Sequence, residues 1–187
     1  MTVEATVPER RTALLGALLL GAGVAVALGV YGRVHTPSYT SLPTFGFSST
    51  PAFKAWVGSV VLVLAFVQLT GALWMYGRLP GAGPAPAWLG PAHRGTGALA
   101  FVLSLPVAAY CLYGIGFAPT PMTARTLVHS VAGCVFYGAF AAKVILVQAR
   151  RVPGWALPVV GGLLFTVIVA GWLTSALWFF RLTGVHG

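Results

Sequence analysis

The sequence predicts an all-α protein, a single integral membrane bundle of five transmembrane helices with up-down topology. Of its 187 residues, 58% are hydrophobic and 7% are charged, whereas a soluble domain carries about 25% charged residues. The apolar residues also gather in five segments, each long enough to cross about 30 Å of hydrocarbon at about 1.5 Å per residue. The predicted spans lie near Thr12–Tyr31, Ala52–Tyr76, His93–Ile115, Arg125–Gln148 and Trp155–Phe180.

The first span follows Arg10 and Arg11, a pair that also precedes cleaved twin-arginine signals. Its apolar stretch is longer than the roughly 7–15 residues of a signal-peptide core, and no small-residue cleavage site follows it. We therefore expect a retained helix. Residues 1–11 are then a cytoplasmic tail, residues 12–180 form one transmembrane domain, and residues 181–187 form an external tail.

The connections between the spans differ in composition. An outer loop at 32–51 is rich in Ser, Thr and Pro, and an inner linker at 77–92 contains a Pro-Gly-Ala-Gly-Pro-Ala-Pro run that cannot be helical. The short connections at 116–124 and 150–154 favour antiparallel neighbours in a compact bundle. Pro106 lies inside the third span, where we expect it to kink the helix.

Two of the predicted helices carry small residues at every fourth position. These ridges are Gly21, Ala25 and Gly29 in the first helix, and Thr96, Ala100, Ser104 and Ala108 in the third. Small residues let helix backbones approach closely in lipid. The ridges therefore predict packing interfaces.

The net charge of +9 does not indicate a nucleic-acid partner, because the basic residues form no continuous stripe. They flank the apolar runs, so their distribution predicts the orientation of the protein in the membrane. With the N-terminus inside, seven basic residues lie on the inner side and four on the outer side. The inner set is Arg10, Arg11, Arg78, Arg94, Lys143, Arg150 and Arg151, and the outer set is Arg33, Lys54, Arg125 and Arg181. This excess predicts a bacterial inner-membrane protein with a cytoplasmic N-terminus and an external C-terminus.

One face of the fourth span carries residue types that suit a haem group. His129 lies about one turn into the helix, with Arg125 four residues before it and Gly133 four residues after it. An imidazole can ligate iron, an arginine can pair with a propionate, and a glycine leaves room for a flat macrocycle. The alternative is that His129 hydrogen-bonds a neighbouring helix and Arg125 is an interfacial anchor.

A six-coordinate haem iron needs a second ligand near the outer face. His35 and His186 lie at the outer ends of the first and fifth spans, so either is a candidate, and each could instead be a solvated interface histidine. His93 lies at the inner end of the third span, too far along the helix axis to share one haem with His129. Tyr110 and Cys111, in the outer half of the third helix, are candidates to line the pocket.

A second polar set lies at the inner side and contains Gln68, His93, Arg94 and Lys143. Lys143 is near enough to the helix end for its ammonium to reach the interface. The alternative is a site for a quinone head group or an anionic lipid, with His93 and Lys143 as donors.

Several functions are disfavoured because their residues are missing. The only acidic residues, Glu4 and Glu9, precede the first span, whereas proton and cation pathways commonly use carboxylates inside the membrane. Cys111 and Cys134 lie in apolar runs and form no zinc or paired-cysteine motif. The sequence also has no phosphate-binding loop or metalloprotease His-Glu motif.

Four stretches resemble an actinobacterial family of uncharacterised membrane proteins. They are Gly46-Phe47-Ser48-Ser49-Thr50, Ala92-His93-Arg94-Gly95-Thr96-Gly97, His129-Ser130-Val131-Ala132-Gly133-Cys134 and the run from Phe136 to Lys143. More distantly, a small bundle with histidines at helix ends is similar to the cytochrome b561 and ferric-reductase-like carriers, which hold b-type haem between helices. That resemblance implies that His93 and His129 are at ligand-type positions.

Three functions remain open at this point. The leading hypothesis is an electron-transfer subunit with one b-type haem near the outer leaflet. Its partner would be a quinone or an extracytoplasmic redox protein. Such a protein is an electron carrier and not a stand-alone enzyme. The second is a non-catalytic anchor or assembly subunit of a hetero-oligomeric redox complex. The third is a small-molecule or lipid-binding transporter, which the proline-bent third helix supports and the lack of inverted repeats disfavours.

Overall fold

The computed structural model describes residues 7–38, 43–149 and 152–185, and these residues are helical or connect helices, with no strand among them. The elements are α1 (Val7–Val34), α2 (Thr50–Met75), α3 (Leu89–Ala109), the π-helix η1 (Tyr110–Ile115), α4 (Ala124–Gln148), α5 (Ala156–Thr174) and α6 (Ala176–Thr183). Within the described ranges, five helical stretches are long and apolar enough to cross a membrane. The predicted all-α bundle of five spans is confirmed.

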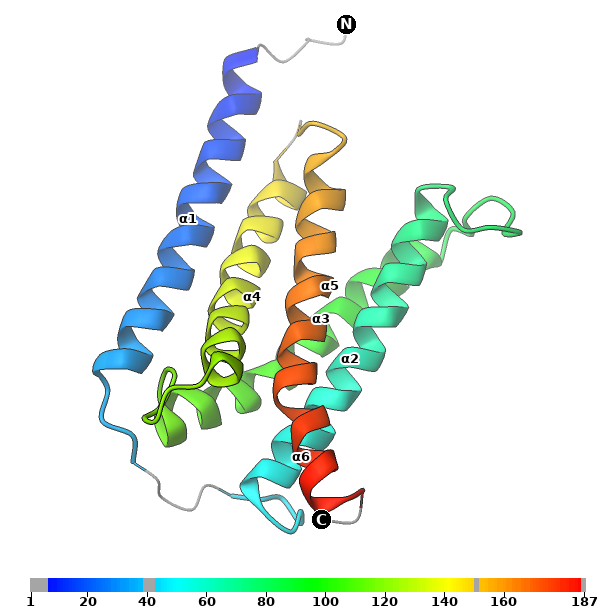
Figure 1. Cartoon of the computed structure of the whole chain (residues 1–187). Coiled ribbons are helices and arrows are strands. Elements are labelled where there is room, and N and C mark those ends of the chain that lie inside the picture. Colours follow the sequence, from blue (N-terminus) through cyan, green and yellow to red (C-terminus); the bar gives the residue numbers. More distant parts are fainter. Residues whose placement is uncertain (1–6, 39–42, 150–151, 186–187) are drawn as a thin grey trace, which may run out of the picture.

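Successive spans run in alternate directions (Figure 1). The start of α1 lies at the upper end of the bundle in that view, and α6 lies at the lower end. We use "lower end" for the end at which α1, η1 and α6 finish and α2 and α4 begin. Two of the helices that begin there are capped by hydroxyls: the Ser49 hydroxyl accepts from the Ala52 N–H, and Thr123 forms a capping box with Thr126.

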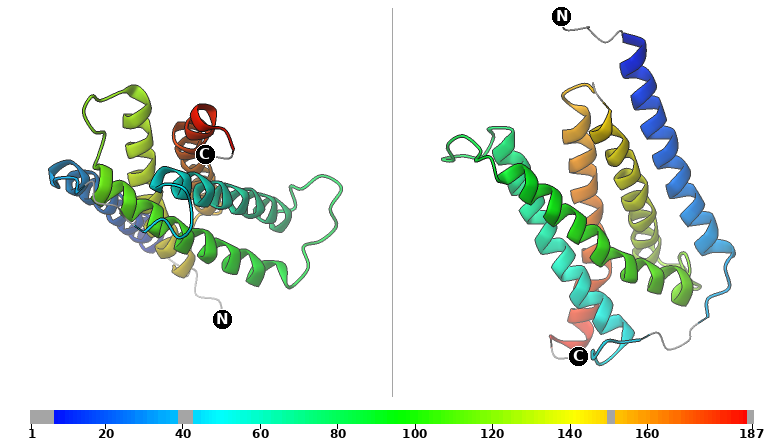
Figure 2. Two further views of the ribbon diagram at one scale, coloured as in Figure 1. Left: turned by 90° about the horizontal axis from the view of Figure 1, so that it is seen from below. Right: turned by 180° about the vertical axis from the view of Figure 1, so that it is seen from behind.

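The spans are arranged as two groups that meet at the lower end. Helix α4 packs against α1 on one side and α5 on the other, while α2 pairs with α3 and reaches the rest of the bundle through α5 and α6. Figures 1 and 2 show the α2–α3 pair leaning away from the other helices toward the upper end. The bundle is therefore less compact than its short connections predict, and α1 packs on α4 and not on its sequence neighbour α2.

The α1–α4 contact uses the small-residue ridge predicted for the first helix. A Cβ atom on Gly21 would lie 2.8 Å from the Gly138 carbonyl oxygen and 3.1 Å from the Ala142 Cβ. A Cβ on Gly138 would in turn meet Gly21 and Ala25. Only glycine at both positions allows this separation, so the ridge is confirmed as an interface.

The third span changes its winding near the lower end. Pro106 lies inside α3, and four residues later the helix becomes π-helical, with the Tyr110 N–H bonded to the carbonyls of Pro106 and Val107. The π-helix ends at Gly116, whose φ of 79° favours glycine. The distortion expected from Pro106 is thus present as a π-helix, which places Cys111 in the wider turn.

The fifth span, predicted from Trp155 to Phe180, is present as one helical stretch, Ala156–Thr183, that contains a break. The helix breaks at Ser175, which has φ −121° and ψ −76°, and continues as α6. Packing supplies the reason, because Ala176 and Phe179 form a buried cluster with residues of α2. The other predicted boundaries differ by a few residues; α3 begins at Leu89, before the predicted His93, because Pro91 is tolerated in a first helical turn.

Large apolar side chains cover much of the outside of the bundle. Leu18 and Leu19 of α1, for example, are 66% and 73% exposed. Such a surface suits a lipid environment, where apolar side chains on the outside carry no penalty. The protein is therefore a multi-pass helical membrane protein.

Candidate functional site

His129 is held in one tautomer by the fifth span. Its Nδ1 lies 3.2 Å from the Gly171 carbonyl oxygen and 3.3 Å from the Thr174 hydroxyl. A carbonyl can only accept, so Nδ1 carries the proton and donates it to Gly171. Nε2 then carries a lone pair that can accept a hydrogen bond or bind a metal, as in most metal-ligating histidines, whose other ring N–H donates to a carbonyl or carboxylate.

The second ring nitrogen of His129 faces Cys111. Its Nε2 lies 3.8 Å from the Cys111 sulfur, where it accepts from the thiol, so α4 and η1 bring two potential metal-ligand atoms to one point. Cys111 forms no disulfide. The neighbouring Tyr110 is buried and turns away, because its hydroxyl donates to the Pro43 carbonyl and its ring packs on Phe53.

Arg125 lies one turn before His129 and is fixed by two contacts with the fifth span. Its Nη1 donates to the Thr174 carbonyl at 2.8 Å, and its guanidinium carbon lies 3.9 Å from the centroid of the Trp178 ring. The Thr174 carbonyl is next to the break at Ser175, so the guanidinium bonds a group at the end of α5. Arg125 is thereby positioned on the same side of the bundle as His129.

Lys54 is a buried cation in the first turns of α2. It is 8% exposed, and it lines the same cavity as Cys111, near enough for an electrostatic interaction with the sulfur. The only acidic residues in the sequence are Glu4 and Glu9. Among the described residues that line the cavity with Lys54 and Arg125, none is an aspartate or glutamate.

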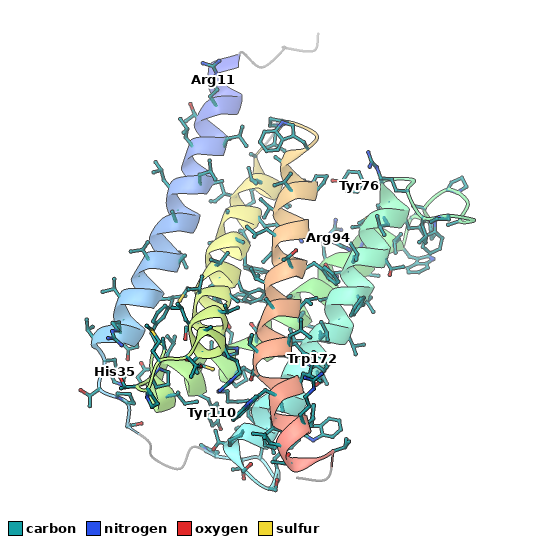
Figure 3. The ribbon with its side chains drawn as sticks, in the orientation of Figure 1. Arg11, His35, Tyr76, Arg94, Tyr110 and Trp172 are labelled. Atoms are coloured by element: carbon teal, nitrogen blue, oxygen red, sulfur yellow. The ribbon has the colours of Figure 1, made fainter. Side chains whose placement is uncertain are left out.

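These side chains line one cavity of about 370 Å³ in the lower half of the bundle. Its walls come from α2, α3 with η1, α4 and the α5–α6 break, and are mostly apolar. Gly133 borders it, and a Cβ there would meet nothing within 4 Å. Figure 3 shows Tyr110 and Trp172 in the lower half of the bundle. The volume is in the range of small-molecule and cofactor sites, about 300–1,000 Å³.

The structure brings together three of the predicted site residues, His129, Arg125 and Gly133, and adds Cys111. His35 does not line the cavity: it stacks on Tyr31 at a centroid distance of 5.1 Å, and its Nε2 is buried without a partner among the described residues. Figure 3 shows it at the end of α1. His186 lies outside the described residues, so the prediction that it is an iron ligand stays a prediction.

The predicted inner set lies in the other half of the bundle. The Gln68 amide donates to the His93 carbonyl at 2.7 Å and to the Thr96 hydroxyl at 2.6 Å, which ties α2 to α3. The Nδ1 of His93 is buried without a partner among the described residues, and Lys143 is near enough to interact with it electrostatically. Gln68 is thus a helix–helix contact, and His93 with Lys143 remains a candidate polar site.

Sequence reasoning missed Lys54 and Trp178 as site residues. A lysine near the start of a span has the same sequence signature as an interfacial anchor. Its burial depends on the several helices that enclose the cavity, which no local pattern predicts. The lack of any carboxylate in the spans was the one available signal, because it leaves each buried cation without a counter-charge.

Comparison with known proteins gives a family. The chain matches no curated protein and no solved structure. Residues 14–187, which include all five spans and every cavity residue named above, match the family of unknown function DUF6529. The chain therefore belongs to this family, DUF6529, whose function is unknown.

Proposed function

We propose that this protein is an electron-transfer subunit that holds one b-type haem in the lower half of the bundle. The observation that carries the proposal is the state of His129. Its Nδ1–H is fixed on the Gly171 carbonyl and its Nε2 lone pair faces the cavity, as in a histidine prepared for a metal. No other histidine lines this cavity among the residues that the structure describes.

The charges around the cavity suit an anionic ligand such as haem. Lys54 and Arg125 supply two cations, and no aspartate or glutamate is among the described residues that line the cavity. A dianionic ligand with a large apolar ring would neutralise the cations with its charged groups and pack its ring against the apolar walls. Gly133 leaves open space on the His129 face of α4.

The protein's own residues have separate tasks in this proposal. His129 would ligate the iron, Arg125 would bind a propionate, Lys54 would place a second positive charge beside the bound group, and the apolar walls would exclude water. When bound, the haem supplies an iron that accepts and releases one electron. The partners that fit such a carrier are a quinone and an extracytoplasmic redox protein, and the distant resemblance to cytochrome b561 supports the same chemistry.

We also propose that the lower end faces the outside of a bacterial inner membrane. The support is the excess of basic residues at the upper end, seven against four. A reporter enzyme that is active only outside the cytoplasm, fused after residue 187, should be active. The same reporter inserted in the linker at Gly81 should be inactive, and the reverse result would invert the topology.

The test of haem binding is the absorption spectrum of protein purified in detergent from cells supplied with haem. The wild type should show a Soret band that shifts on reduction, and His129→Ala should lose it. His93→Gln, which changes a histidine at the other end of the bundle, should keep the band. If the wild type is colourless and brings a partner protein with it, the anchor hypothesis replaces this proposal.

A further inference from the structure

We propose that the thiolate of Cys111 is the second axial ligand, opposite His129. This inference rests on the proposed haem site. In it, Cys111 takes the place of His35 and His186 as the candidate second ligand. It uses three observations: the facing donor atoms of Cys111 and His129, the burial of Lys54 beside the sulfur, and the π-helical turn that contains Cys111.

The spacing of the two donor atoms suits a metal between them. Metal–imidazole and metal–thiolate bonds of about 2.0 and 2.3 Å add up to about 4.3 Å in a linear arrangement. The His129 Nε2 and the Cys111 sulfur are 3.8 Å apart. A separation increase of about 0.5 Å would therefore accommodate an iron atom between them, with the macrocycle crossing the gap between α4 and η1.

Lys54 provides the charge that a thiolate needs in an apolar site. A nearby cation stabilises the thiolate form of cysteine, the form that binds metals. Lys54 is 8% exposed and lines the same cavity as the Cys111 sulfur, near enough for an electrostatic interaction with it. A buried lysine without a carboxylate partner is costly on its own, and a thiolate ligand supplies the missing negative charge.

The second cysteine of the chain lacks these features. Cys134 is one turn beyond Ser130 on α4, and its sulfur points toward α1, where a Cβ on Gly29 would lie 3.8 Å from it. The π-helix, by contrast, turns Cys111 toward α4, and such wider turns occur often at functional sites. Cys134 is therefore a matched control for Cys111.

The bond forms without oxidation or reduction. Cys111 gives a sulfur lone pair to the iron, and the thiol proton leaves to water. The iron keeps its oxidation state, and the positive charge of Lys54 balances the new negative charge on sulfur. No additional oxidant or reductant is needed.

The test is resonance Raman spectroscopy of the purified wild-type protein in its ferric state, grown with ordinary or heavy-sulfur cysteine. We expect an iron–sulfur stretching band that moves to lower frequency with the heavy isotope. Cys111→Ala should keep a Soret band through His129 and lose the isotope-sensitive band, and Cys134→Ala should keep both.

The outcomes separate this inference from the proposed function. A wild-type protein that contains haem but has no sulfur-sensitive band overturns the Cys111 assignment and leaves haem binding intact. A colourless wild type overturns haem binding, and the Cys111 assignment with it. Because the isotope measurement needs only the wild type, it remains decisive if Cys111→Ala does not fold.

Discussion

Replacing Lys54 with methionine should stabilise the haem-free protein and weaken haem binding. Lys54 is 8% exposed and no aspartate or glutamate is among the described residues that line its cavity, and a buried ion retains an effective penalty of several kcal/mol. Methionine keeps most of the apolar stem and removes the charge. We expect the free energy of unfolding of the haem-free protein to rise by about 1 kcal/mol or more.

The effect on binding has the opposite sign. A hydrogen bond to a charged group contributes about 1.5–3 kcal/mol, which corresponds to a loss of haem affinity of about 10- to 150-fold. The two quantities are measured by denaturant unfolding of the haem-free protein in detergent and by haem titration followed at the Soret band.

The matched control is Arg181→Met, which removes one positive charge from an exposed position at the same end of the bundle. It should change stability by less than about 0.5 kcal/mol and leave haem affinity unchanged. If Lys54→Met destabilises the haem-free protein and binds haem as the wild type does, the argument from the uncompensated buried cation is wrong.

Three further predictions follow from single contacts. Gly138→Ala places a Cβ against the α1 backbone and should lower the free energy of unfolding by about 1–3 kcal/mol. The control Gly161→Ala, where nothing lies within 4 Å, should be neutral or stabilising by up to about 1 kcal/mol. Equal destabilisation by both variants would contradict the close α1–α4 contact. Gln68→Leu should cost about 0.6 kcal/mol by removing two hydrogen bonds between α2 and α3 and should leave the Soret band unchanged; loss of the band would place the haem elsewhere. Arg125→Met frees the Thr174 carbonyl, so hydrogen exchange near the α5–α6 break should increase and haem affinity should fall; unchanged exchange would mean that the guanidinium does not hold the break.

The course of the chain through the membrane could be predicted because it depends on local properties. The length of each apolar run sets a span, and residues such as Pro106 and Gly116 mark where regular helix changes or ends. The helix pairing could not be predicted in the same way. The ridge at Gly21 indicates that some backbone comes close, but it does not identify Gly138 as the partner.

The candidate site was partly accessible for the same reason. His129, Arg125 and Gly133 lie on one face of one helix, so their spacing alone brings them together. Cys111 reaches His129 through the π-helix, and Lys54 is buried where several helices enclose one cavity. The break at Ser175, without glycine or proline at that position, is likewise a product of tertiary packing.

The most direct measurement of the central claim is the molar ratio of extractable b-type haem to purified chain. For protein produced with sufficient haem, the account predicts a ratio near one for the wild type and near zero for His129→Ala. A wild-type preparation that is folded, monodisperse and as free of haem as the His129→Ala variant would contradict it.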